Sequence, residues 1–196
     1  MFFNPFPVNQ LLHAQPPLLR LAPLPIGNEF EYSFLPDARR AKAVVRLIGE
    51  NTTTNYITHT EVLEGRAEHT RRWAHFRRSM LIADIRSAIR RKRKGEGGVL
   101  AARKGKGKRN RILGVAVLRY DKRHRYGVIE DIVVDVRTRG TGVGSQLMAA
   151  AFRTMKEAGM ENVILESGCR NKDAHRFFKR HGFKEAAVMF MKSLSD

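Results

Sequence analysis

The stretch of this chain best suited to chemistry is a glycine-rich turn, which runs from Arg139 to Gly144 with the sequence RGTGVG. An apolar, β-branched run precedes it over residues 129–136, and a helical pattern of apolar residues follows it over residues 143–158. A strand, a glycine-rich turn and a helix N-terminus together present backbone N–H groups and a positive dipole end to an anion. The turn lacks both the G-K-[ST] ending of a P-loop and the G-x-G-x-x-G spacing of a dinucleotide-binding turn. It therefore predicts an anion-binding turn of another kind, with a plain strand-to-helix connection as the alternative.

Two motifs in this half of the chain resemble those of the GNAT acetyltransferase superfamily. Arg139, Gly142 and Gly144 match the R/Q-x-x-G-x-G/A loop of that family. The run over residues 162–167 resembles the family's next strand. The N-x-x-A-x-x-F-[YF]-x-x-x-G-F pattern of its last helix is matched by Asn171, Ala174, Phe177, Phe178, Gly182 and Phe183. The resemblance is clear over residues 113–192, weaker over residues 29–102, and absent before Gly27.

This resemblance implies an acetyl-CoA-dependent N-acetyltransferase that moves an acetyl group directly to a primary amine. It implies that a strand segment hydrogen-bonds the pantetheine arm as an added strand would, and that one of its N–H groups polarises the thioester carbonyl. Asn171 matches an asparagine that reaches the pantetheine in relatives, and capping of the following helix is its alternative role. Arg139 either pairs with a phosphate or only flanks the turn. The implied CoA-binding residues are Ile132, Val133 and Val134 on the strand, Arg139, Gly140, Thr141, Gly142, Val143 and Gly144 in the turn, and Asn171 and Phe178 beyond it.

Acetyl transfer needs a base, because an alkylammonium with a pKa near ~10 must lose a proton at neutral pH. Glu130, Asp131 and Glu166 are the candidate bases. Glu130 and Asp131 are neighbours on a predicted strand, so we expect them to face opposite sides and only one to face the site. Glu166 aligns with the strand glutamate that activates the amine through water in ribosomal-protein acetyltransferases. We rank Glu166 before Glu130, and pairing with the chain's many cations is the alternative role for all three.

The departing thiolate needs a proton, and at this point the chain departs from the family pattern. Most relatives place a tyrosine at the second aromatic position of the last helix, near the CoA sulfur. This chain has Phe178 there, which has no proton to give. Tyr126, Tyr120 and His175 are alternative donors, and water or unassisted departure is a further alternative. No cysteine or histidine partners stand at metal-ligand spacing, so no metal is expected.

The unusual bulk property is a formal net charge of +18. Fifteen of the 37 Lys and Arg residues lie between Arg90 and Tyr126, against two acids, so this segment alone carries +13. Such a segment predicts contact with RNA, the ribosome or another polyanion, and a solvated basic face is the alternative. We therefore expect an acceptor that is anionic or associated with a polyanion. The alternative function is a nucleic-acid- or ribosome-binding protein on an acetyltransferase scaffold that has lost catalysis, which Phe178 favours.

The patterning around these motifs predicts an α/β (α+β) fold of the GNAT type, with a twisted, mostly antiparallel mixed sheet and helices on both faces. Two strands are expected to form a basic β-hairpin, within the segment at about residues 90–126, whose tip consists of glycines and cations. A long amphipathic helix is expected over about residues 69–94, with an apolar stripe made of Trp73, Phe76, Met80, Leu81, Ile85 and Ile89. The expected elements are strands over residues 29–35, 97–103, 111–120 and 183–192, helices over 37–49 and 69–94, and a polar loop over 51–60.

A length of 196 residues predicts one domain over residues 28–196, preceded by a proline-rich arm over residues 1–27. The arm's apolar content indicates that it packs on the domain or on a second subunit, as in a homodimer. The arm lacks the charged start and the uninterrupted apolar centre of a secretory signal. No apolar run approaches the ~18 residues of a membrane-spanning helix. A single cysteine excludes an internal disulfide framework, so a reducing cytoplasm is the expected location.

Overall fold

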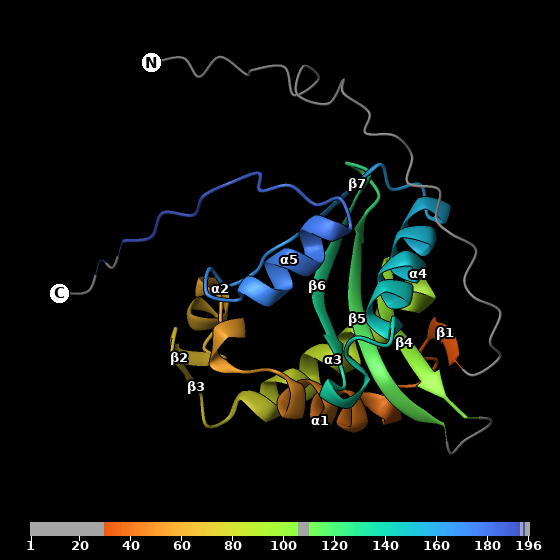
Figure 1. Cartoon of the computed structure of the whole chain (residues 1–196), viewed down its shortest axis with the longest axis horizontal. Helices are drawn as coiled ribbons and strands as arrows, with labels where there is room; N and C mark the ends of the chain where they lie inside the picture. Colours follow the sequence, from red (N-terminus) through yellow and green to blue (C-terminus); the bar gives the residue numbers. More distant parts are fainter. Residues whose placement is uncertain (1–29, 106–109, 193, 195–196) are drawn as a thin grey trace, which may run out of the picture.

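The computed structural model describes residues 30–105, 110–192 and 194. The predicted arm over residues 1–27 lies outside the described residues, and so do residues 106–109 of the predicted hairpin tip. Figure 1 shows a central twisted sheet with helices on both of its faces, which confirms the predicted fold class. Within the described part of the chain, no helix combines the length and the apolar character needed to cross a membrane.

Five strands form the sheet in the order β1-β4-β5-β6-β7. β1 (Phe30–Phe34), β4 (Gly97–Lys104), β5 (Arg111–Asp121) and β6 (Tyr126–Val134) pair in antiparallel fashion, whereas β6 and β7 (Asn162–Leu165) are parallel. Both predicted strands of the hairpin are present with nearly the expected bounds. Their alternate residues are buried on opposite faces, because helices cover the sheet from both sides.

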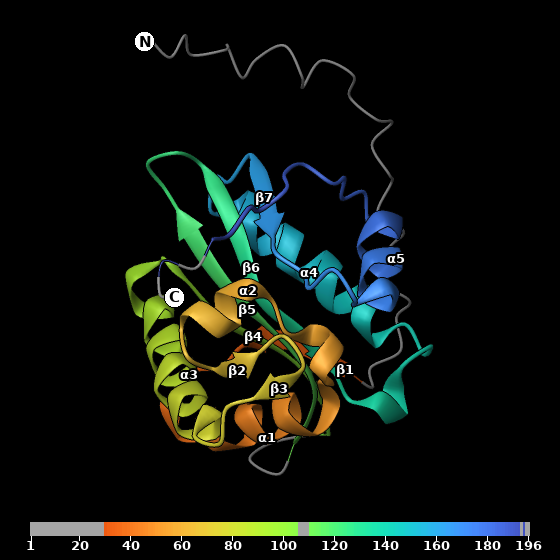
Figure 2. The ribbon, with the colours of Figure 1, turned by 90° about the vertical axis from the view of Figure 1, so that its left-hand side faces the viewer.

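One face of the sheet is covered by α1 (Ala41–Asn51) and α3 (Arg77–Lys94), with a 3₁₀ turn (Ala38–Arg40) leading into α1. The opposite face is covered by α4 (Val143–Glu157), and α5 (Lys172–Arg180) lies on the same side, as Figure 2 shows. Val115 and Val117 of β5 pack toward α1 and α3, while Ala116 and Leu118 pack toward α4. The period of two in a strand thus divides one sequence between two cores.

The predicted long helix over residues 69–94 is wrong in its first two turns. A two-stranded hairpin, β2 (Ala67–His69) and β3 (Arg72–Trp73), occupies that stretch, and the helix begins at Arg77. The Arg77 guanidinium lies 3.3 Å from the centre of the Trp73 ring, so the tryptophan packs back against the helix start. Phe76 is 59% exposed and does not belong to an apolar stripe. The helical spacing of apolar residues continues upstream of Arg77 by coincidence. The pairing of β2 with β3 decides the local structure there.

The predicted polar loop over residues 51–60 is also partly wrong, because it contains a 3₁₀ turn (Thr54–Tyr56) and the start of α2 (His59–Leu63). The Thr58 hydroxyl caps α2 by accepting a hydrogen bond from the Glu61 N–H at 3.2 Å. Thr58 and Glu61 have the three-residue spacing of a capping box. This short helix carries one wall of the candidate site.

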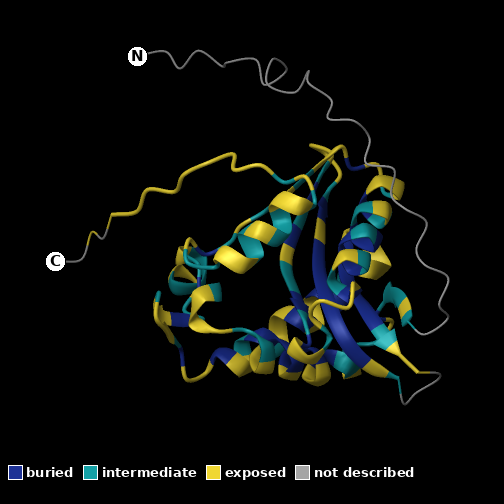
Figure 3. Cartoon of the chain, in the orientation of Figure 1, coloured by how far each residue is buried: buried dark blue, intermediate teal, exposed yellow. Residues whose placement is uncertain are grey.

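The predicted final strand over residues 183–192 is absent, and the segment has no regular secondary structure. Phe183 packs against Phe152 of α4 with ring centres 5.7 Å apart, but Val188 and Phe190 are 79% and 93% exposed. Figure 3 shows this exposed segment leaving the body of the molecule. Valine and phenylalanine favour strands, but a strand also needs a partner edge, and residue type alone does not supply one.

Gly97 gives a direct test of the β4–β5 pairing. A Cβ at this position would lie 2.2 Å from the Leu118 carbonyl oxygen, and the φ angle of Gly97 is +113°. We expect Gly97→Ala to lower the free energy of unfolding by about 3 kcal/mol, measured by urea denaturation. The control is Gly65→Ala, where φ is +74° but no atom lies within 4 Å, and we expect a loss of about 1 kcal/mol. Equal losses would contradict the close strand contact.

Candidate functional site

The candidate site lies where β6 and β7 part. Their parallel pairing runs from Tyr126 and Asn162 to Ile129 and Leu165, where β7 ends. β6 continues to Val134 and remains paired with β5 on its other edge. In the described part of the chain, no strand pairs with the second edge of β6 beyond Ile129. This free edge offers backbone hydrogen-bonding groups to an extended ligand.

A β-bulge lies at the start of this free edge. Val117 of β5 pairs with Asp131, whereas the next residue, Leu118, pairs with Ile129, so Glu130 is the extra residue on β6. Ile129 and Ile132 both pack toward α4. In a regular strand, residues three positions apart would point to opposite faces, so the bulge changes the alternation. As a result, Glu130 and Asp131 both line the same cavity on the other face. The expectation that only one of these two carboxylates would face the site is therefore wrong.

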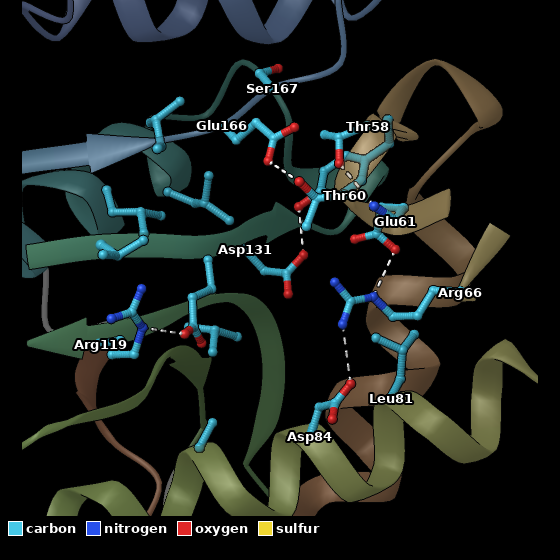
Figure 4. A pocket seen from close by; sticks show the side chains of 18 of the residues that line it. Thr58, Thr60, Glu61, Arg66, Leu81, Asp84, Arg119, Asp131, Glu166 and Ser167 are labelled. Atoms are coloured by element: carbon cyan, nitrogen blue, oxygen red, sulfur yellow. Dashed lines mark hydrogen bonds and ion pairs between the residues drawn. The ribbon is translucent and has the colours of Figure 1, made fainter. Parts of the chain in front are cut away.

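The cavity has a volume of about 460 Å³ and is bounded by α2, α3, α5, parts of β5 and β6, and the end of β7. Figure 4 shows Asp131 near its centre, Glu166 and Thr60 on one side, and Glu61, Arg66 and Asp84 on another. All three candidate bases line it, so the structure brings together Glu130, Asp131 and Glu166. Their surroundings differ, however, and these differences separate their chemical roles.

Asp131 is held by a tyrosine that the sequence analysis did not single out. The Tyr56 hydroxyl donates a 2.7 Å hydrogen bond to Oδ1 of Asp131. Burial raises the pKa of Asp131 to about 6, against the opposing effect of the Tyr56 hydrogen bond, and the negative charge of Glu61 adds to the rise. Burial and the Asp131 charge raise the pKa of Tyr56 well above its usual value, whereas the backbone N–H of Ile132 acts in the opposite direction. The Tyr56 hydroxyl therefore lies at the free edge of β6.

The other two carboxylates have different partners. Glu130 pairs with Arg91 of α3 and with Arg119 of β5, whose Nε lies 3.0 Å from Oε1. Two guanidinium groups therefore neutralise its charge. Glu166 is exposed and accepts a 2.6 Å hydrogen bond from the Thr60 hydroxyl of α2. This bond links the end of β7 to the α2 wall of the cavity.

Arg66 forms ion pairs with several carboxylates of the α2 wall and of α3. It pairs with Glu61 at 2.9 Å, with Asp84 of α3 at 3.4 Å, and with Glu64. Three carboxylates face one guanidinium here, so this end of the cavity is acidic although the chain as a whole carries +18. Such local acidity favours entry of an ammonium group.

The glycine-rich turn lies beyond the end of β6 and leads directly into α4. Gly140 and Gly142 have φ angles of +80° and +88°, a conformation that favours glycine. Gly142 is the N-cap of α4, no side chain caps this helix, and its first N–H groups have no intrahelical partner. A Cβ added at Gly140 would meet no atom within 4 Å, so the space in front of the turn is open. These features fit an anion at the α4 N-terminus.

Asp135 holds this turn against the sheet. Its carboxylate is 2% exposed, caps the 3₁₀ turn Val136–Thr138, and accepts hydrogen bonds from Arg137 at 3.0 and 2.8 Å and from Arg111 at 2.6 Å. The Arg137 contact holds the pKa of Asp135 well below its usual range. The Arg139 guanidinium donates to the carbonyl of Asn51 at the end of α1, so it flanks the turn here.

α5 also lines the cavity. Asn171 stands at the N-cap position, but its side chain makes no capping hydrogen bond and instead lines the cavity. Phe178 also lines the cavity and packs edge-to-face against Phe177. Phe177 lies against the start of α4, with ring atoms 3.5 Å from where a Cβ on Gly144 would stand. Contacts at Asn171 and Phe178 are therefore available to a ligand that lies along β6.

The predicted basic segment is divided between two ends of the sheet. Gly97 pairs with Arg119 and Lys104 pairs with Arg111, so the start and the end of β4 are about 24 Å apart along the strands. The last turn of α3 lies at the first end, beside the β5–β6 turn, where the Lys122 ammonium approaches Gly95. The surface formed by Lys92, Arg93, Lys94, Lys122 and Arg123, called the α3-end patch, is exposed. Arg91, which directly precedes Lys92 in α3, lines the cavity, so the patch begins one residue beyond it.

Comparison with known proteins identifies the family to which this chain belongs. A model of the Acetyltransferase (GNAT) family matches residues 62–183, which is more than half of the chain. The chain belongs to the GNAT acetyltransferase family. Members of this family use acetyl-CoA as the acyl donor. The matched range includes α3, the free edge of β6, the glycine-rich turn and α5.

The alignments with sequence relatives cover only part of this GNAT chain. It is 40% identical over 68 residues to the aminoalkylphosphonate N-acetyltransferase of Salmonella typhimurium, covering 35% of this chain and 44% of that protein. It is 38% identical over 64 residues to the N-alpha-acetyltransferase MAK3 of Arabidopsis thaliana, covering 33% and 34%. The matched region therefore spans less than half the length of each of these curated relatives.

Solved structures extend the likeness of fold over most of the chain. An acetyltransferase of Trypanosoma brucei aligns with a TM-score of 0.53 at 22% identity, covering 85% of this chain and 100% of that one. Ard1 from Thermoplasma volcanium aligns with a TM-score of 0.56 at 22% identity, covering 81% and 85%. At these identities the comparisons establish a shared fold.

The cavity residues that sequence reasoning missed all come from the stretch before the GNAT motifs. Tyr56, Glu61 and Arg66 precede or begin the matched range and have no motif spacing of their own. The capping box at Thr58 and Glu61 would have revealed a helix there but not the cavity. Among the described residues, no three His, Cys, Asp or Glu side chains form a group that would hold a metal ion.

Asp135 gives a test of how the turn is held. We expect Asp135→Asn to lower the free energy of unfolding by about 2 kcal/mol at pH 7, because the buried amide cannot replace the charge-assisted bonds to Arg111 and Arg137. The folded-state pKa of Asp135 is depressed, so its stabilisation is complete above the unfolded-state pKa near ~3.9 and is lost as the pH falls below it. The difference from the unsubstituted chain in urea denaturation should therefore shrink at pH 3. The exposed Asp173→Asn serves as the control and should cost less than about 0.5 kcal/mol.

Proposed function

We propose that this chain transfers the acetyl group of acetyl-CoA directly to a primary amine. The observation that carries the proposal is the position of Asp131, a carboxylate with a pKa raised to about 6, at the free edge of β6 inside an acidic cavity. The amine must lose a proton before it attacks the thioester, and a nearby carboxylate with a raised pKa is a suitable acceptor. Membership of the GNAT family supports the same chemistry.

Acetyl-CoA binding is proposed for the free edge and the turn. The N–H groups of Gly142, Val143 and Gly144 at the α4 N-terminus would hold the pyrophosphate, with Arg139, Gly140 and Thr141 forming the rest of the turn. The side chains of Ile132, Val133 and Val134 pack into the two cores, so these residues have their backbone groups to offer the pantetheine arm. Asn171 and Phe178 would contact that arm from α5.

Asp131 is the base that the surroundings favour among the three candidates. Glu130 is neutralised by Arg91 and Arg119, which leaves it suited to positioning these arginines at the cavity rim. Glu166 is exposed and bonded to Thr60, so it is better suited to orient the acceptor near the mouth. Asp131 combines partial burial with a place beside the free edge of β6.

The acceptor we propose is an amine on an anionic or polyanion-associated molecule. Two features support this: the acidic wall around Arg66 suits the ammonium group, and the adjoining α3-end patch suits a phosphate-rich body. An amine group on a protein bound to RNA or the ribosome would match both surfaces. The alternative, a polyanion-binding protein that has lost catalysis, has the absence of a phenol at Phe178 in its favour.

Acetyl-CoA binding at the turn can be tested with a matched pair of glycine variants. We expect Gly142→Glu to weaken acetyl-CoA binding at least tenfold in calorimetric titration, because a carboxylate at the α4 N-terminus repels the pyrophosphate. Gly159→Glu is the control, since Gly159 has a similar φ of +83° at the other end of α4 and has open space around it. Binding that is equally weak or equally strong in the two variants would argue against this anion site.

The polyanion surface can be tested with two matched charge reversals and total tRNA as the probe. We expect the double variant Lys92→Glu, Lys122→Glu to weaken tRNA binding and to reduce its salt dependence. Arg153→Glu, Lys156→Glu makes the same charge change on the exposed face of α4 and should have a smaller effect. Equal effects would show that only net charge matters. Binding of tRNA without release of free CoA thiol in the presence of any amine would favour the alternative function.

A further inference from the structure

The cavity contains one phenol, and it comes from outside the GNAT motifs. Tyr56 lies in the 3₁₀ turn between α1 and α2, and its hydroxyl points at Asp131 across the free edge of β6. Phe178, which faces the same cavity from α5, has no proton to give. The three alternative donors considered from sequence do not line the cavity. Tyr120, for example, packs in the α4 core and bonds to Thr154 at 3.2 Å.

The chemistry of transfer requires its two proton-handling groups to be close together. The attacking nitrogen and the departing sulfur are both bonded to one carbon when the tetrahedral adduct forms. A group that takes the nitrogen's proton and a group that protonates the sulfur must each approach within about 2.6–3.2 Å of its atom. The two groups are therefore neighbours, and the 2.7 Å hydrogen bond between Tyr56 and Asp131 meets this requirement.

We propose that Tyr56 and Asp131 form a proton relay that carries the amine's proton to the departing sulfur. This inference rests on the proposed acetyl transfer. Asp131 first removes the ammonium proton and passes it to solvent, so that the neutral amine attacks. In the relay, Asp131 then takes the second proton from nitrogen as the C–N bond forms. Tyr56 gives its hydroxyl proton to the sulfur as the C–S bond breaks, with the bond's electron pair leaving on sulfur. Protonated Asp131 then returns a proton to Tyr56, so the pair ends as it began and the products are the amide and the free thiol.

The electrostatics of the pair explain why both members are needed. Burial is the main cause of the raised pKa of the Tyr56 phenol, and while Asp131 is ionised its charge and hydrogen bond raise that pKa further. When Asp131 takes up a proton, the contribution of its charge disappears and the phenol becomes a better proton donor. The charged neighbours act together: Glu61 of α2 and Glu130 of β6 favour protonation of Asp131, whereas Arg66 opposes it. Arg77 of α3 also interacts electrostatically with both Tyr56 and Asp131.

The relay can be tested with Tyr56→Phe, Asp131→Asn and the double variant, using Tyr120→Phe as a matched control. The acceptor is whichever amine of a panel gives the fastest release of CoA thiol with the unsubstituted chain. Suitable panel members are an N-terminal peptide, spermidine and aminomethylphosphonate.

We expect each single variant to lower kcat roughly 100-fold with little change in acetyl-CoA binding by calorimetry. The double variant should be within about threefold of the weaker single one, because the residues act as a unit. Tyr120→Phe should keep its kcat.

The plateau of the pH profile separates a relay from a purely structural role of Tyr56. Loss of the hydrogen bond moves the rise in kcat, whereas loss of the proton donor also leaves kcat roughly 100-fold lower on the plateau above that rise. With the unsubstituted chain, kcat should rise as the pH passes through about 6, where Asp131 ionises. Because the Tyr56 hydrogen bond lowers the pKa of Asp131, its loss in Tyr56→Phe should move this rise to higher pH. An unchanged kcat in Tyr56→Phe, or additive losses in the double variant, would overturn the relay while leaving acetyl transfer intact. Acetyl-CoA binding without turnover of any amine by the unsubstituted chain would overturn both proposals.

Discussion

The geometry of the site depends on one irregularity in the sheet, the bulge at Glu130 in β6. The extra residue turns Glu130 and Asp131 to the same face, and the pairing of β6 with β7 ends beside it. Without the bulge, one of the two carboxylates would lie in the α4 core, where its charge would have no counterpart. With it, a row of carboxylates faces a cavity and an unpaired backbone edge follows directly. The free edge, the cavity and the turn at the α4 N-terminus all continue from this point.

The three candidate bases that line this cavity have three different environments, and their electrostatic surroundings suit each of them to a different role. Glu130 is paired with two arginines, Glu166 is exposed and bonded to a threonine, and Asp131 is partly buried against a phenol. The same principle acts at Asp135, whose arginine partners lower its pKa while burial raises that of Asp131. One residue type thus supports a rigid turn at one place and a titratable group at another.

The charge of the chain is also organised by the fold. The cavity wall around Arg66 is acidic, whereas the α3-end patch beside it is basic, although both belong to a chain with a net charge of +18. The basic segment is continuous in sequence, but β4 and β5 run in opposite directions and carry its two parts to opposite ends of the sheet. Only part of that charge therefore adjoins the cavity, and a simple charge count does not describe the surface that a partner would meet.

Most elements of the fold, and its class, could be predicted because strand and helix periods are local properties of the sequence. β1, β4, β5 and α4 lie close to their expected ranges, and the glycine-rich turn was found from its spacing. The prediction failed at residues 69–76 because a local hairpin between β2 and β3 replaced the expected helix. It failed at residues 183–192 because, among the described residues, no strand pairs with this segment. By itself, the sequence determined the family motifs, the glycine-rich turn and the three candidate bases. Only the tertiary structure decided that Glu130 and Asp131 share a face and that Tyr56 joins them, because a bulge and a contact across 75 residues arise from packing between strands and loops.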